Sequence, residues 1–249
     1  MLRAHATMPG AVAPGDAIPQ PSLAFEITEM PFLTYRPNRV AQPGAAHGEA
    51  PRVIALPRPD SSSGVPLMTT LSIRACMREF APAPVRAETS GALLRGADGI
   101  NRPVTSRRTA PSSHALQAIH IDAALPDGVD RHDASPHRLT LGHATNARNL
   151  TGYQDFVGTA RLGLRYVVRT SLFLDMAASR RNMISAVTAR AISQNVSLHR
   201  TSAGLAAVAR GRIDHHLPSD MLSLKGDGLP ILARTAGLSA SDAKQQPGA

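Results

Sequence analysis

Prolines divide the chain into two unequal parts. Fifteen of the 20 prolines fall within residues 1–111, and none occurs between Pro136 and Pro218. Because proline fixes φ and has no amide hydrogen to donate, it interrupts helices and the interior of sheets. We therefore expect the first part to be largely disordered, and regular structure to form mainly after residue 136.

Large apolar side chains, which supply much of an ordinary core, are scarce. Aromatic residues make up 3% of the 249 residues, and there is no tryptophan. Burying alanine removes little apolar area from water, while ordering each backbone residue costs about 1–2 kcal/mol. The composition thus predicts a mostly irregular or disordered chain with a small α-helical C-terminal region and no confident globular fold.

Local patterns divide the chain into four regions. Helices are expected over residues 67–81, 112–125, 157–171, 181–193 and 202–212. The third could instead be a strand, because "RYVVRTSLFL" is rich in β-branched and aromatic residues. The four regions are a proline-rich disordered region (1–111), a loop-rich linker with a possible short helix (112–150), a basic helical region (151–217) and a disordered tail (218–249).

Positive charge is concentrated in the basic helical region. The chain has 27 basic and 18 acidic residues, and between Phe156 and Ile213 the only acid is Asp175. Such a segment can follow a phosphate backbone, lie on an anionic membrane, or be the solvated face of a packed helix. A helix would align three arginines spaced four apart. With two that follow, they are the candidate contacts to nucleic acid or another polyanion: Arg161, Arg165, Arg169, Arg180 and Arg181.

The sequence offers no other strong site. Cys76 is the only cysteine, which excludes an intrachain disulfide and a cysteine-based metal site within one chain. No apolar run reaches 18 residues, so we predict no transmembrane segment. Phosphate-binding glycine loops and nucleophile-elbow motifs are missing. We therefore expect no cofactor, and take the cytoplasm as the default compartment.

One short motif resembles a known hydrolase family. In "GRIDHHLPSD", Asp214, His215 and His216 are similar to the motif that names the DHH phosphoesterases. The resemblance implies a two-metal hydrolase that activates water and clamps a phosphate. That family also carries a paired-aspartate motif, whereas "GADGIN" here contains Asp98 alone. We therefore assign no metal ligand or catalytic residue.

Three functional hypotheses stay open. The chain has 25 arginines against two lysines, and its conflicting local signals are typical of a GC-rich reading frame without a selected function. A second hypothesis is a basic helical interaction protein that binds nucleic acid or another polyanion. A third is a DHH-type phosphoesterase. The sequence alone assigns no function, and we expect a protein that is not an enzyme.

Overall fold

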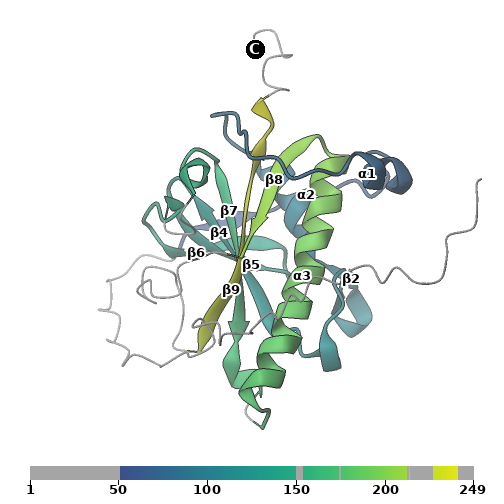
Figure 1. Ribbon diagram of the computed structural model, residues 1–249, viewed down its shortest axis with the longest axis vertical. Coiled ribbons are helices and arrows are strands. Elements are labelled where there is room, and N and C mark those ends of the chain that lie inside the picture. The colour runs from purple at the N-terminus through teal and green to yellow at the C-terminus, as the bar shows by residue number, and fades with distance from the viewer. Residues whose placement is uncertain (1–50, 150–153, 174, 212, 214–226, 241–249) are drawn as a thin grey trace, which may run out of the picture. The chain divides into compact units, whose positions relative to one another are not determined.

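A seven-stranded sheet with helices packed on it dominates the computed structural model (Figure 1). The structure describes residues 51–149, 154–173, 175–211, 213 and 227–240. All of them belong to one compact unit, residues 36–249.

Every neighbouring pair of strands in this sheet is antiparallel, and the strand order is β1-β6-β5-β4-β7-β9-β8. The strands are β1 (Val53–Ala55), β4 (Ile119–Leu125), β5 (Gly128–Asp133), β6 (Arg138–His143), β7 (Leu162–Arg169), β8 (Leu205–Arg210) and β9 (Gly228–Leu238). A separate two-stranded ribbon consists of β2 (Ile100–Arg102) and β3 (Arg107–Arg108). Short 3-10 turns are η2 (Pro103–Thr105), η3 (Ser113–Ala115), η5 (Asp155–Val157) and η6 (Thr170–Phe173).

The described α-helices are α1 (Leu67–Ile73), α2 (Ala87–Asp98) and α3 (Ala178–Ser202). Helices α2 and α3 pack on each other and on one face of the sheet (Figure 1). Leu94 of α2, Val196 of α3 and Tyr166 of β7 are fully buried in the core between them. Alanines on the helices and strands complete this core, because small side chains allow a helix to approach a sheet closely.

The expectation of a mostly disordered chain is wrong, since regular structure begins at residue 53. Within the described residues, the prolines of the first part lie between elements or at the start of one, where a fixed φ and a missing amide hydrogen are tolerated. Pro66 precedes α1, Pro82 and Pro84 separate α1 from α2, and Pro103 begins η2. Residues 1–50 lie outside the described part of the chain.

The helix predicted over residues 157–171 is also wrong. This segment runs from the last residue of η5 through β7 to the first residues of η6, and every β7 residue except Arg169 is buried. A strand buried on both faces reads as a continuous apolar run, without the alternation that distinguishes strands from helices. The β-branched and aromatic residues were the better signal here.

Two further helices are strands in the structure. Residues 112–125 form η3 and β4, and residues 205–210 form β8. Gly204, with φ of 69°, adopts the left-handed conformation after α3 and turns the chain into β8. The helix predicted over 181–193 is confirmed within α3, and the one over 67–81 forms only as far as Ile73.

Strand pairing joins segments from different predicted regions: β1 pairs with β6, and β7 pairs with β9.

No helix among the described residues is long and apolar enough to cross a membrane. The cytoplasmic compartment stays a prediction.

Candidate functional site

Buried arginines gather near the C-terminal ends of α3 and β9. Arg200 of α3 is 3% exposed, and its guanidinium donates hydrogen bonds to the carbonyl oxygens of Ala75 and Leu205. Ala75 follows α1 in the segment that then runs along β8 and β9, with the Met77 amide donating to Ala207 and the Ala81 amide to Leu238. The backbone therefore fixes where this guanidinium lies.

Arg234 of β9 is the second buried cation of this group and is 4% exposed. Its Nη2 donates to the hydroxyl oxygens of Ser193 and Ser197 on α3, at 3.0 and 2.7 Å. The buried Tyr166 hydroxyl lies close enough to interact with it. Burial lowers the pKa of Arg234, because desolvation disfavours the charged form.

We call the buried Arg200 and Arg234, together with the exposed Arg74, the arginine cluster, because the charges of Arg234 and Arg74 both act on Arg200. Burial lowers the pKa of Arg200, and the positive charges of Arg234 and Arg74 lower it further. Within the described residues, no carboxylate forms an ion pair with any of the three. Buried cations without a counterion are costly, so the arginine cluster suits an anion with several oxygens, such as a phosphate.

A second unusual feature is the strained loop, residues 112–118, which leads into β4. His114, Ala115 and Gln117 have positive φ angles of 54°, 55° and 45°. Such conformations cost about 1–3 kcal/mol each in non-glycine residues and persist only where their surroundings impose them. Backbone strain of this kind concentrates at functional sites, so the strained loop is a candidate binding element.

Hydrogen bonds hold the strained loop in this conformation. The Gln117 amide donates to the Ser112 hydroxyl at 2.8 Å, and Gln117 Nε2 donates to the Ser106 carbonyl at 3.0 Å. Arg169 Nη2 donates to the Gln117 carbonyl at 3.2 Å. His114 and Ala115, at the tip, stay exposed and available to a ligand or a partner.

Arg200 of the arginine cluster and the strained loop lie toward opposite ends of β9, and Arg234 lies between them. The strained loop enters β4 at Ile119, which pairs with Val168, and Val168 in turn pairs with Leu229 near the start of β9. Leu205, the carbonyl partner of Arg200, pairs with Leu238 at the other end of β9. An 11-residue strand is roughly 35 Å long, so one small ligand cannot span both ends of it within a single chain.

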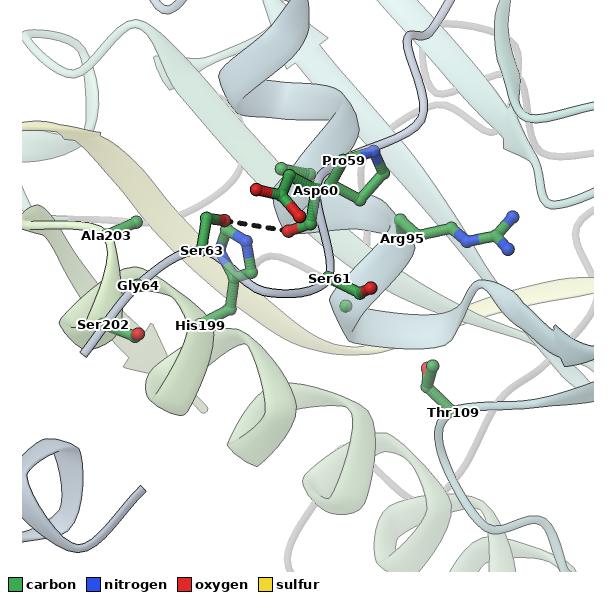
Figure 2. A pocket seen from close by; sticks show the side chains of 12 residues that line it. Pro59, Asp60, Ser61, Ser63, Gly64, Arg95, Thr109, His199, Ser202 and Ala203 are labelled. Carbon is green, nitrogen blue, oxygen red and sulfur yellow. Dashed lines mark hydrogen bonds between the residues drawn. The ribbon is translucent and has the colours of Figure 1, made fainter. Parts of the chain in front are cut away.

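A pocket of about 250 Å³ lies between the loop 59–64, α2 and the C-terminal end of α3 (Figure 2). Gly64 lines it, and the Ser202 hydroxyl holds the loop by accepting a hydrogen bond from the Val65 amide and donating one to the Val65 carbonyl. Figure 2 shows the Arg95 side chain extending away from His199 and Ser202. The pocket wall thus anchors the chain ahead of α1 to α3 and gathers no charged groups around a common point.

The structure separates the arginines that the sequence singled out. Arg161 donates to the Pro82 carbonyl at 2.7 Å, and Arg165 is buried with its Nη2 3.4 Å from Asp122 Oδ2. The helical stripe expected for Arg161, Arg165 and Arg169 does not exist, because β7 replaces the helix.

The remaining sequence candidates fall in two places. Arg180 and Arg181 are in the first turn of α3, where the former is exposed and the latter half-buried. A binding role for each of the five arginines stays a prediction. Asp214, His215 and His216 lie outside the described residues. Among the residues that are described, no group of three or more His, Cys, Asp or Glu side chains could hold a metal ion.

Sequence reasoning missed Arg200, Arg234 and the strained loop. A usable signal existed for Arg234, because an arginine inside the apolar run "GLPILARTAGL" is unusual for a buried strand. No comparable signal marked Arg200, because the basic helical region predicted from the sequence contains many other arginines. The positive φ angles of the strained loop depend on contacts with Ser106 and Arg169, which are distant in sequence.

Comparison with known proteins shows which family shares this fold. Residues 71–238 match the nitroreductase family. A candidate nitroreductase from Ralstonia eutropha JMP134 is 40% identical, with a TM-score of 0.72, over 83% of this chain and 99% of that one. Two more distant structures share the fold. One is NADPH:FMN oxidoreductase from Vibrio harveyi in complex with NAD+, 18% identical with a TM-score of 0.51 over 73% of this chain and 72% of that one. The other is the Escherichia coli microcin synthetase McbBCD complex, 18% identical with a TM-score of 0.58 over 74% and 77%.

The fold is therefore that of an α/β oxidoreductase family. The chain belongs to the nitroreductase family, although no curated protein matches it. This membership corrects the functional hypotheses drawn from the sequence. The chain is not a reading frame without function, its function is not that of a polyanion-binding helical protein or a DHH-type phosphoesterase, and the expectation that it is not an enzyme is wrong.

Proposed function

We propose that the protein is a flavin-dependent oxidoreductase that uses a nicotinamide nucleotide to reduce nitro compounds. The observation that carries this proposal is the arginine cluster, a set of guanidinium groups without a carboxylate partner among the described residues, in a chain of the nitroreductase family. The structurally similar Vibrio harveyi enzyme is an NADPH:FMN oxidoreductase. Flavin mononucleotide (FMN) ends in a phosphate, the kind of anion that this cluster suits.

The residues present fit such a cofactor. Arg200 and Arg234 are both buried, and each has an Nε atom without a hydrogen-bond partner among the described residues. Their other nitrogens are fixed by Ala75, Leu205 and two serines of α3, so the groups are oriented before the anion arrives. Preorganised guanidinium groups bind phosphate without the cost of ordering flexible side chains.

The bound flavin would accept a hydride from the nicotinamide nucleotide and pass two electrons to the acceptor. The chain's contribution is to hold the phosphate at the arginine cluster, and to present the strained loop as a rigid surface. Backbone strain at His114, Ala115 and Gln117 costs stability, so a role in binding explains it better than a role in folding.

A second copy of the chain would bring a strained loop close to an arginine cluster, which lie apart along β9 within one chain. Helices α1 and α3 expose large apolar side chains, namely Leu67, Met68, Leu71, Ile73, Met183 and Val187. Exposed apolar groups of this size mark interaction surfaces. In a two-fold homodimer built on these helices, the arginine cluster of one copy and the strained loop of the other would share one flavin.

The activity is tested with FMN-loaded protein under anaerobic conditions. NADPH or NADH is mixed with the protein, and nitrobenzene or nitrofurazone is then added. We expect bleaching of the flavin absorbance by the nucleotide, followed by its recovery with formation of the reduced nitro product. A flavin that neither nucleotide reduces would refute the proposed function.

The dimer is tested by sedimentation equilibrium. Met68→Asp places a charge on the exposed apolar side of α1 and is expected to weaken association at least tenfold. Val104→Asp, at a fully exposed turn of η2, is the control and should leave the mass unchanged. A wild-type protein that stays monomeric at high micromolar concentration, with FMN bound, would exclude the shared site.

A further inference from the structure

The ribbon formed by β2 and β3 carries an unfavourable pair of like charges. Arg102 of β2 lies directly opposite Arg107 of β3, which brings their Cβ atoms within about 5.5 Å. Like charges in such a cross-strand pair destabilise the ribbon. Both side chains are exposed, so a stabilising core does not explain the arrangement.

Neither arginine of this pair has a carboxylate partner among the described residues. Arg102 donates to the Arg108 carbonyl at 2.7 Å and to the Asn101 side-chain oxygen at 3.1 Å. Asp98, the only acidic residue between positions 89 and 121, is bonded to Arg108 instead. Within the described part of the chain, the pair therefore presents two guanidinium groups without an acidic partner, which leaves their charge to be balanced by a ligand or by ions from solution.

The ribbon is rigidly connected to the strained loop. The Ser106 carbonyl, in the turn beside Arg107, accepts a hydrogen bond from Gln117 Nε2, and the Thr109 amide donates to the Gly99 carbonyl at the end of α2. Ser106 itself has a φ of 51°, so the strain of the loop extends into this turn. A ligand that contacts the strained loop would thus have the Arg102–Arg107 pair beside it.

We propose that Arg102 and Arg107 bind a phosphate monoester, and that this group is the 2′-phosphate of NADPH. The proposal rests on the proposed function, in which a nicotinamide nucleotide supplies the electrons. NADPH and NADH differ by this one phosphate, and two adjacent guanidinium groups match the oxygens of a dianion. The pair therefore makes the enzyme select NADPH, and the bound phosphate relieves the repulsion between the two arginines.

The experiment compares both nucleotides with FMN-loaded protein. We expect the wild type to show a KM for NADPH about ten- to a hundredfold below that for NADH, the range of one or two charge-assisted hydrogen bonds. Arg107→Gln should raise the KM for NADPH by about tenfold or more, with no change in kcat or in the KM for NADH. Arg86→Gln, an exposed arginine at the start of α2, is the matched control and should change neither constant.

A direct binding measurement separates the phosphate from turnover. Titration calorimetry with 2′-AMP and adenosine should show at least tenfold tighter binding of 2′-AMP to the wild type, and no preference in Arg107→Gln. Arg107→Lys keeps the charge but not the fork-shaped donor group, so it should retain an intermediate preference. Flavin content and melting temperature confirm that each variant is folded.

The outcomes separate this inference from the proposed function. Equal use of NADPH and NADH by the wild type would overturn the inference while leaving the function intact. A preference for NADPH that survives Arg107→Gln would also overturn it, as would equal affinity of the holoprotein for inorganic phosphate and 2′-AMP. If neither nucleotide reduces the flavin, the proposed function fails first.

Discussion

Arg234 illustrates a residue whose burial is better explained by binding than by stability. Its charge is removed from water and, within the described residues, meets two serine hydroxyls and Tyr166 but no carboxylate. A buried charge of this kind contributes little or nothing to folding. The charge of Arg234 becomes favourable only when an anion binds at the arginine cluster.

Replacing Arg234 by methionine should therefore affect stability and binding differently. The loss of two hydrogen bonds is offset by removal of a desolvated charge, so we expect the free energy of unfolding to change by about 1 kcal/mol or less. FMN affinity should fall about ten- to a hundredfold. Urea unfolding of the apoprotein and fluorescence titration with FMN measure the two effects. A large loss of stability with unchanged FMN affinity would show that Arg234 is structural.

At Gly64, the addition of a single Cβ atom is expected to destabilise the fold. Its φ is 99°, and a Cβ there would collide with the Ser202 hydroxyl that holds the loop 59–64. Gly64→Ala should reduce the free energy of unfolding by more than about 1 kcal/mol. Gly211→Ala is the control, since a Cβ at Gly211 meets nothing within 4 Å, and it should stay within about 0.5 kcal/mol of wild type. Chemical unfolding compares the two, and equal effects would argue against the fixed loop.

At the scale of elements, packing of α3 on the sheet decides the fold. Val196 of α3 is 0% exposed, whereas Val104 in η2 is 100% exposed. Removing two methyl groups from the core should cost about 2 kcal/mol, through lost burial and the cavity left behind.

Val196→Ala and Val104→Ala form a matched pair for this packing. The first should lower the urea midpoint clearly, and the second should leave it nearly unchanged. If both variants unfold at the wild-type midpoint, the helix-on-sheet core described here would be incorrect.

The sequence predicted some elements and not others for identifiable reasons. Residues 181–193 kept their helical period and were predicted correctly, since one side of α3 faces the core and the other faces solvent. Residues 162–168 and nearly all of 205–210 are buried on both sides, so their patterns carry no period, and both segments are predicted to be helices from the sequence. Arg200 and the positive φ angles of the strained loop depend on distant contacts, which a local pattern cannot contain.

At the scale of the whole molecule, buried histidines make stability depend on pH. Burial lowers the pKa of His120 to about 4 and that of His132 to about 3. Below their ordinary pKa of 6.5, the unfolded chain binds protons that the folded chain excludes, so stability falls as pH falls. Asp98 acts in the opposite direction, because burial raises its pKa to about 6 and the folded chain takes up this proton first.

These three groups together contribute a loss of about 1.4 kcal/mol per pH unit between pH 6 and 4.5. His137 and His199, whose pKa values burial also lowers, add to this loss, whereas Asp130, whose pKa burial raises, opposes it. His120→Gln removes one of these groups and should reduce the slope of stability against pH by about 1.4 kcal/mol per unit in this range. Urea unfolding at a series of pH values measures both slopes. Parallel curves for the two proteins would show that His120 is not buried in its neutral form.

The proposed function depends on the binding of a flavin through its phosphate at the arginine cluster. The most direct measurement is a fluorescence titration of the apoprotein with FMN and with riboflavin, which lacks the phosphate, in wild type and in Arg200→Gln. We predict one FMN per chain, bound at least tenfold more tightly than riboflavin, and loss of this preference in the variant. Equal affinity of the wild type for the two flavins, or no binding of either, would show that the arginine cluster does not bind the flavin phosphate.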